Sequence, residues 1–114
     1  MHELSLMENV VEILREDARM RDIKTISRVR LNIGRLTMVL PDSMHFAFEI
    51  LSQDDLFAPE AVLEIEMKEI LAHCLQCERD IRSSEYVFAC PDCQSPRLNI
   101  IQGQELNIDF YEGE

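Results

Sequence analysis

Two cysteine pairs, Cys74-Leu75-Gln76-Cys77 and Cys90-Pro91-Asp92-Cys93, constrain the fold of this chain more than any other feature. Each two-residue gap lets a tight turn aim both sulfurs at one ion, and twelve residues between the pairs can fold back as a hairpin. Four thiolates around one ion make a closed tetrahedral zinc site without room for a substrate. A segment of about thirty residues buries little apolar surface, so zinc is expected to supply much of its folding free energy.

Redox-active pairs and disulfides are the alternative interpretations of the four cysteines. Thioredoxin-like chemistry places one such pair at the start of a helix after a strand, whereas here two pairs occupy turns. No run approaches about 18 uncharged apolar residues, and the first residues lack the basic region and apolar run of a secretion signal. We therefore expect a cytoplasmic protein without a membrane segment, whose reduced thiols bind metal.

The charge of the chain argues against a nucleic-acid partner. The formal net charge is −11, and after residue 35 the chain holds 4 basic residues against 16 acidic ones. Affinity for phosphate backbones comes from clustered Lys and Arg, which this composition lacks. Tyr86 and Phe88, two residues apart on an expected strand, are interpreted as hydrophobic support under the zinc site and not as a base-stacking pair.

Two segments show helical spacing of apolar residues and three show strand alternation. The first helix is expected between Leu4 and Met20, with its apolar side formed by Met7, Val10, Val11, Leu14 and Ala18. The second follows Pro41-Asp42-Ser43, with Met44, Ala47, Phe48 and Leu51 on one side. Apolar and polar residues alternate in the expected strands 28–33, 63–68 and 106–110.

The order of these elements predicts an α+β fold, with two helices on a three-stranded sheet whose other face is wet. The cysteine segment interrupts this order between the second and third strands. We therefore expect one α+β domain made of residues 1–70 and 101–114, and an inserted zinc-ribbon-like module at 71–100.

The chain start, Met1-His2-Glu3, offers a second set of metal donors. The amine of Met1, the deprotonated amide of His2 and the His2 imidazole can close two adjacent chelate rings, with Glu3 as a source of a fourth donor. Such a set suits square-planar Ni(II) or Cu(II) better than zinc. Binding displaces protons, so affinity is expected to fall on acidification. An ordinary exposed terminus is the alternative reading of the triplet.

Several motifs together resemble the hydrogenase-maturation nickel metallochaperones, the HypA/HybF family. These are the start MHELSL, the run Arg30-Leu31-Asn32-Ile33-Gly34-Arg35-Leu36, the segment Pro41-Asp42-Ser43 with Phe46-Ala47-Phe48, and the paired cysteine motifs. The resemblance spans essentially the whole chain in one order. This chain departs from many members after the first cysteine pair, where it has Glu78-Arg79. Those members have a glycine or a less charged turn there.

The resemblance implies a nickel carrier with a structural zinc site at Cys74, Cys77, Cys90 and Cys93. His2 would be the indispensable nickel ligand, supported by Met1 and Glu3, and His73 is a candidate accessory residue beside the zinc cluster. The implied partners are a nickel-handling GTPase and the large subunit of nickel-iron hydrogenase, with urease accessory proteins for some members. Members often self-associate, so a homodimer is also among the implied assemblies.

The sequence gives no sign of an enzyme. It has no phosphate-binding glycine loop, and every cysteine is assigned to zinc, which leaves no nucleophile paired with a base. A zinc-ribbon adaptor that binds proteins but transfers no nickel is the alternative function. Nickel binding at the chain start would separate the two.

Overall fold

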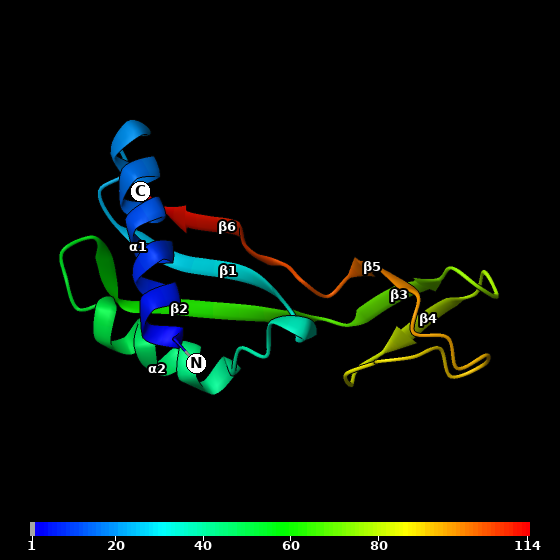
Figure 1. The fold of residues 1–114 in the computed structure, drawn as a ribbon. Coiled ribbons are helices and arrows are strands. Elements are labelled where there is room, and N and C mark those ends of the chain that lie inside the picture. Colours follow the sequence, from blue (N-terminus) through cyan, green and yellow to red (C-terminus); the bar gives the residue numbers. More distant parts are fainter. Residues whose placement is uncertain (1) are drawn as a thin grey trace. The chain divides into compact units, whose positions relative to one another are not determined.

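The computed structural model describes residues 2–114 of the chain. Its elements, in chain order, are α1 (Glu3–Met20), β1 (Ile26–Gly34), the short 3-10 helix η1 (Arg35–Thr37), α2 (Pro41–Leu51), β2 (Phe57–Lys68), β3 (Ile70–Cys74), β4 (Asp80–Ser83), β5 (Leu98–Gln102) and β6 (Leu106–Gly113) (Figure 1). The predicted α+β architecture is confirmed. Within the described part, neither α-helix has the length and apolarity that crossing a membrane requires.

The chain divides into two compact units. One takes in the chain up to Leu31 together with Val39–Ile65 and Ile108–Glu114, and the other consists of Asn32–Met38 and Glu66–Asn107. The second unit therefore includes the turn after β1 as well as the cysteine segment.

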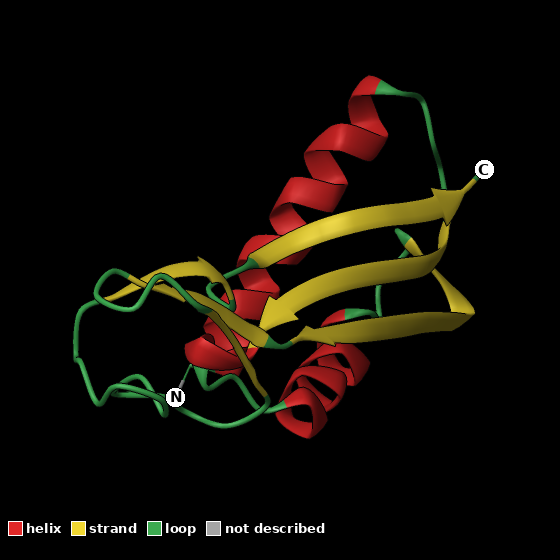
Figure 2. Cartoon of the chain, turned by 90° about the vertical axis from the view of Figure 1, so that its right-hand side faces the viewer, coloured by secondary structure: helices red, strands yellow, loops and turns green. Residues whose placement is uncertain are grey.

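The first sheet has the strand order β2-β1-β6, and α1 and α2 lie against one of its faces (Figure 2). The apolar stripe of each helix and the apolar side chains that alternate along β1 are buried between the helices and the sheet. Burial therefore follows the sequence pattern. The buried side chains include Met7, Val10, Val11, Leu14 and Ala18 of α1, Val29, Leu31 and Ile33 of β1, and Met44, Ala47 and Phe48 of α2. These positions confirm both predicted helices and the central strand.

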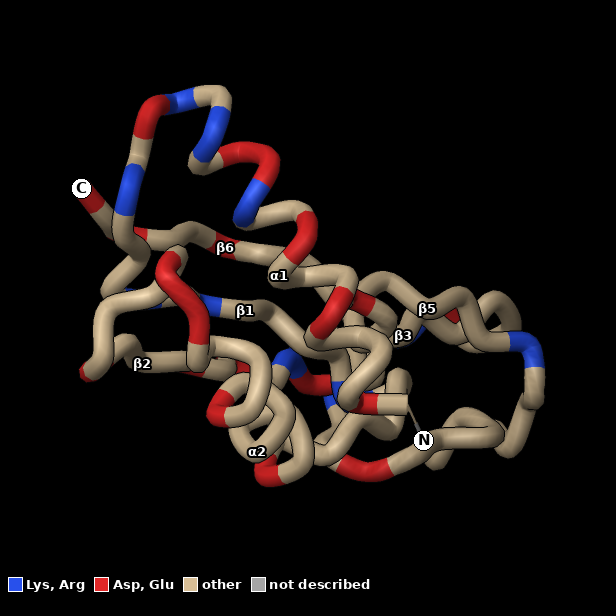
Figure 3. Tube along the Cα trace, turned by 90° about the vertical axis from the view of Figure 1, so that its left-hand side faces the viewer, with Lys and Arg blue, Asp and Glu red and all other residues tan. Residues whose placement is uncertain are grey.

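The opposite face of this sheet is polar, as the alternation predicts. Arg28 donates two hydrogen bonds to the Glu64 carboxylate, at 2.7 and 2.8 Å, and a third to Glu112 at 2.8 Å. Its guanidinium carbon also lies 4.9 Å from the centroid of the Phe110 ring. Charge is distributed differently on the helices, since α1 carries both signs whereas α2 carries only acidic charges and no Lys or Arg (Figure 3).

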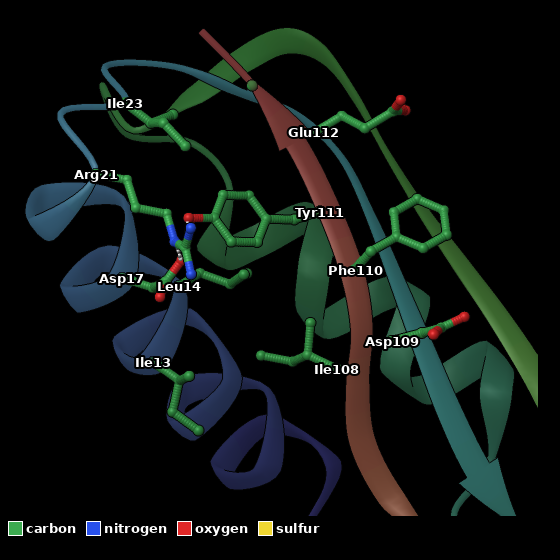
Figure 4. A pocket seen from close by; sticks show the side chains of 11 residues that line it. Ile13, Leu14, Asp17, Arg21, Ile23, Ile108, Asp109, Phe110, Tyr111 and Glu112 are labelled. Atoms are coloured by element: carbon green, nitrogen blue, oxygen red, sulfur yellow. Dashed lines mark hydrogen bonds and ion pairs between the residues drawn. The ribbon is translucent and has the colours of Figure 1, made fainter.

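The edge strand β6 departs from the simple alternation. Figure 4 shows Ile108 and Tyr111 pointing toward α1, whereas Phe110 lies on the other side of the strand. These side chains help to line an open cavity of about 680 Å³ between α1 and β6. Within it the Tyr111 hydroxyl donates a hydrogen bond to the Asp17 carboxylate, which also pairs with Arg21 at 2.8 Å. Polar contacts thus tie α1 to the strand where apolar packing is incomplete.

The cysteine segment forms its own antiparallel sheet, with β3 between β4 and β5. The interpretation of Tyr86 and Phe88 as strand residues beneath zinc is wrong. Both lie outside the strands, their side chains are 49% and 78% exposed, and their ring centroids are 4.5 Å apart. The apolar support of the cysteine cluster comes from Ile81 and Leu98 instead, because β4 ends at Ser83 and the chain continues without regular structure.

Candidate metal centre

The four cysteines converge in the second unit. The Sγ atoms of Cys74, Cys77, Cys90 and Cys93 all lie within 4.8 Å of one another. Cys74 ends β3, Cys77 closes the turn that follows, and the other pair occupies the turn before β5. Each turn is closed by a backbone hydrogen bond, from Glu78 N–H to the Cys74 carbonyl and from Gln94 N–H to the Cys90 carbonyl, at 2.9 and 2.8 Å.

The spacing of the sulfurs fits a tetrahedral zinc ion. Zn–S bonds of about 2.3 Å in a tetrahedron place the sulfurs about 3.8 Å apart. The Cys74–Cys93 and Cys77–Cys90 Sγ distances are 3.5 and 3.7 Å. Zinc bound here would be held by four thiolates, and its role would be structural because no coordination position stays open for a substrate.

The surroundings of the cluster shift the pKa values of its thiols in opposite directions. The Cys77 N–H, 3.5 Å from the Cys74 sulfur, and the Gln76 N–H lower the pKa of Cys74 to about 6. Although the Arg79 N–H lowers the pKa of Cys77, burial and the neighbouring sulfurs raise it overall to about 12. The protein groups thus lower the pKa of Cys74 and raise that of Cys77, and a bound divalent ion would deprotonate each thiol that coordinates it.

His73, the candidate accessory residue, is half-buried on β3 directly before Cys74. Its Nδ1 lies 2.8 Å from the Asp80 carboxylate, and the two residues face each other in the β3–β4 register. The structure therefore gives this imidazole a partner on the neighbouring strand. The contact holds the imidazole in place beside Cys74, which is what a residue that supports a metal ligand requires.

The chain start lies in the first unit. His2 is exposed and occupies the position before the first turn of α1, with φ −111° and ψ 50°. Its carbonyl accepts the Leu6 N–H at 2.9 Å, which attaches the residue to the helix. The imidazole is thereby presented at a defined helix end. Met1, a further predicted ligand of this group, lies outside the described residues.

Glu3 is buried at the start of α1. Its carboxylate accepts a hydrogen bond from the Leu40 N–H at 3.2 Å, and this N–H together with its own N–H lowers the pKa of the carboxyl group. Leu40 is the residue before α2, so this contact joins the starts of the two helices. No sequence pattern predicts it, since the partner is a backbone group 37 residues away.

A cavity of about 370 Å³ lies between the start of α1 and one side of α2. Its lining includes His2 and Glu3 from one side and Ser43, Phe46 and Ile50 from α2. Phe46 and Ile50 stand outside the buried stripe of α2. Phe46 belongs to the run Phe46-Ala47-Phe48 that resembles the family, but no role was predicted for either side chain. Their spacing of four residues is the signal that could have identified a second apolar side.

Comparison with known proteins gives matches along the whole chain. The family model described as "Hydrogenase/urease nickel incorporation, metallochaperone, hypA" matches residues 1–113. The hydrogenase maturation factor HypA of Moorella thermoacetica is 43% identical over 114 residues, covering all of both chains. The hydrogenase maturation factor HybF of Klebsiella pneumoniae is 35% identical with the same coverage. These descriptions are of metallochaperones and maturation factors, not of enzymes.

A solved structure shares the fold. The solution structure of the Ni metallochaperone HypA from Helicobacter pylori matches with a TM-score of 0.69 and 24% sequence identity, covering 99% of this chain and 97% of that one.

Proposed function

The chain belongs to the hydrogenase/urease nickel-incorporation metallochaperone family, and we propose that it binds Ni(II) at its N-terminus and delivers it to the large subunit of nickel-iron hydrogenase. Membership confirms the family resemblance read from the sequence. The observation that carries the proposal is the whole-length family match in a chain whose His2 is exposed at the start of α1.

The proposed nickel donors are the Met1 amine, the His2 amide and imidazole, and a donor from Glu3. A planar nitrogen-rich set of this kind suits Ni(II). Because the Glu3 carboxylate is engaged by the Leu40 N–H, its use as a ligand would require that hydrogen bond to be exchanged for a metal bond. The exposed position of His2 suits a cargo site, since a recipient has to reach the ion.

The second part of the proposal is a resident zinc ion at Cys74, Cys77, Cys90 and Cys93. The sulfur geometry supports it, and the small apolar core around Ile81 explains why this segment would need a metal to stay folded. The division into a nickel-binding domain, residues 1–70 and 101–114, and a zinc-binding insert, residues 71–100, is part of this proposal.

The family name supports a place in hydrogenase or urease maturation. Within it we propose a nickel-handling GTPase and, where urease is served, urease accessory proteins as further partners. Self-association to a homodimer and a cytoplasmic location, where the four thiols would stay reduced, also belong to the proposal.

Nickel titration by calorimetry tests the cargo site. The zinc-loaded chain with an unmodified start is compared with His2→Ala and with His45→Ala, a control that removes an exposed histidine from α2. We expect about one nickel per chain for the parent and the control, and none for His2→Ala, because loss of the imidazole opens the chelate. Zinc content, measured by mass spectrometry, should stay the same in all three.

Equal titration of His2→Ala and the parent would contradict the nickel site at the chain start. The protein would then be better described as a zinc-stabilised interaction adaptor.

A further inference from the structure

Glu3 is the one buried acidic side chain among residues 2–114, with 7% of its surface exposed. A buried carboxylate is costly unless hydrogen bonds compensate for the lost water. Here the Leu40 N–H donates to it at 3.2 Å, and the Glu3 N–H donates to it as well. Contacts within the chain therefore account for the position of this side chain before any metal binds.

The start of α2 has no capping side chain of its own. Leu40 precedes the helix and has no side-chain oxygen, and Pro41 follows as the first helical residue. Backbone N–H groups at the start of a helix lack partners within it and favour nearby negative charge. The Glu3 carboxylate supplies both the acceptor and the charge to α2 from the first residue of α1.

Glu3 also follows His2, which carries the proposed nickel donors. Its side-chain contact with Leu40 fixes the first residue of α1. In the same turn the Leu6 N–H donates to the His2 carbonyl at 2.9 Å, which attaches His2 to the helix. These contacts make a continuous path from the start of α2 through the first turn of α1 to His2.

We propose that the Glu3 side chain is a positioning residue of the nickel site and not one of its ligands. Its hydrogen bond to Leu40 holds the first turn of α1 in place, and this turn holds the His2 donors in the orientation that binds the ion. Donors that are ordered in advance lose less conformational entropy on binding. The inference rests on the proposed function and deepens it, and the donor proposed from Glu3 would then be a backbone atom.

Three substitutions of Glu3 separate an anchor from a ligand. Glu3→Gln removes the carboxylate but keeps a carbonyl oxygen at the same reach, which can accept the Leu40 N–H. Glu3→Asp keeps a carboxylate but shortens the side chain by one methylene, which withdraws it from Leu40. Glu3→Ala removes both features. Glu8→Gln, at an exposed residue of α1, is the matched control for the loss of one negative charge.

Nickel titration by calorimetry of the full-length, zinc-loaded chain measures the effect. We expect Glu3→Ala and Glu3→Asp to raise the Kd for nickel by about five- to thirtyfold, the factor that corresponds to ordering the backbone of one residue. Glu3→Gln should stay within about threefold of Glu8→Gln, because a neutral acceptor retains most of the contact. A ligand role predicts the opposite order, with Glu3→Asp binding more tightly than Glu3→Gln, because only the aspartate retains a carboxylate for the metal.

Hydrogen exchange of backbone amides gives a readout that needs no nickel. In the zinc-loaded, nickel-free protein, the amides of Leu40 and Leu6 should lose protection in Glu3→Ala and keep it in Glu3→Gln, because opening of the first turn exposes both. The amides of β1 should stay protected in every variant, which checks that the fold is retained.

Tighter nickel binding by Glu3→Asp than by Glu3→Gln, or equal binding by the parent and all three variants, would overturn the positioning role. Unchanged exchange of the Leu6 amide in Glu3→Ala would overturn the path through the first turn of α1. A parent chain that binds no nickel would contradict the proposed function and this inference together. That result is distinct from a parent that binds nickel beside variants that bind it equally well, which contradicts the inference alone.

Discussion

Gly34 lies where the chain leaves β1, in close contact with the segment that precedes β6. A Cβ atom at this position would lie 2.0 Å from the Gly103 oxygen, 2.1 Å from its carbonyl carbon and 2.6 Å from the Gln104 nitrogen. All three are backbone atoms, so no flexible side chain can move aside. An ordinary contact begins at 3.4 Å, and the two segments would therefore have to separate by about 1.4 Å, the difference between 3.4 and 2.0 Å.

That separation would break the hydrogen bonds that hold the segments together. Leu36 N–H donates to the Gly103 carbonyl at 2.8 Å, and Gly34 N–H donates to the Glu105 carbonyl at 2.7 Å. Loss of both costs about 2 kcal/mol, and overpacking adds about 1–3 kcal/mol. Gly34→Ala should therefore lower the free energy of unfolding by about 3–5 kcal/mol, a large part of the stability of an ordinary domain.

Urea unfolding of the zinc-loaded protein, followed by circular dichroism, measures this effect. Arg35→Ala, at the exposed neighbouring residue, serves as the control and should change stability by less than about 0.5 kcal/mol. If Gly34→Ala were as stable as Arg35→Ala, the close approach of the two backbone segments would be refuted.

Two further predictions concern the two units separately. Tyr111→Phe removes the hydroxyl that donates to Asp17 and should destabilise the protein by about 1 kcal/mol in urea unfolding at neutral pH. Burial and the Asp17 hydrogen bond raise the pKa of Tyr111 from 10.0 to about 12. The stability that the hydroxyl contributes is therefore present below about pH 10 and is lost as the pH rises through 12. A stability difference between the parent and Tyr111→Phe that stays constant up to pH 12 would contradict this prediction. Removal of zinc with a chelator should increase hydrogen exchange in β3, β4 and β5, because their buried core is small, and leave α1 and β1 protected. Uniform exchange across both units would argue against a metal-dependent second unit.

Local patterns predicted the elements of the first unit because core burial and secondary-structure period coincide there. The stripe from Met7 to Ala18 and the alternation around Leu31 each have one buried side, and the structure buries those sides. The cysteine cluster could be predicted for a related reason. Four ligands in two short turns can meet at one point with few alternative arrangements, so spacing alone identified the group that the structure brings together.

The features that sequence reasoning missed depend on partners distant in the chain or on breaks in the pattern. The Glu3 carboxylate meets a backbone N–H, which has no sequence signature. Alternation in 106–110 implied that Ile108 and Phe110 share a face, but β6 turns Tyr111 toward α1 and Phe110 toward Arg28. Tyr86 and Phe88 are aromatic residues with the two-residue spacing of a strand face, yet the short β4 ends at Ser83, before them. Composition alone does not show where a strand stops.

The two proposed metal sites differ in the way that permanent and transient binding require. At the cysteine cluster every candidate ligand is the side chain of a folded turn, and Cys74 and Cys90 are fully buried. The Cys77 N–H also donates to the Cys74 sulfur. Release of an ion from this site would therefore disrupt the small core around Ile81. At the chain start the His2 carbonyl accepts the Leu6 N–H, and the exposed His2 side chain lies outside the buried core of residues 2–114. A metal can therefore leave His2 without unfolding the protein. This asymmetry supports the proposal that the cargo ion is passed on from the chain start and not from the cysteine cluster.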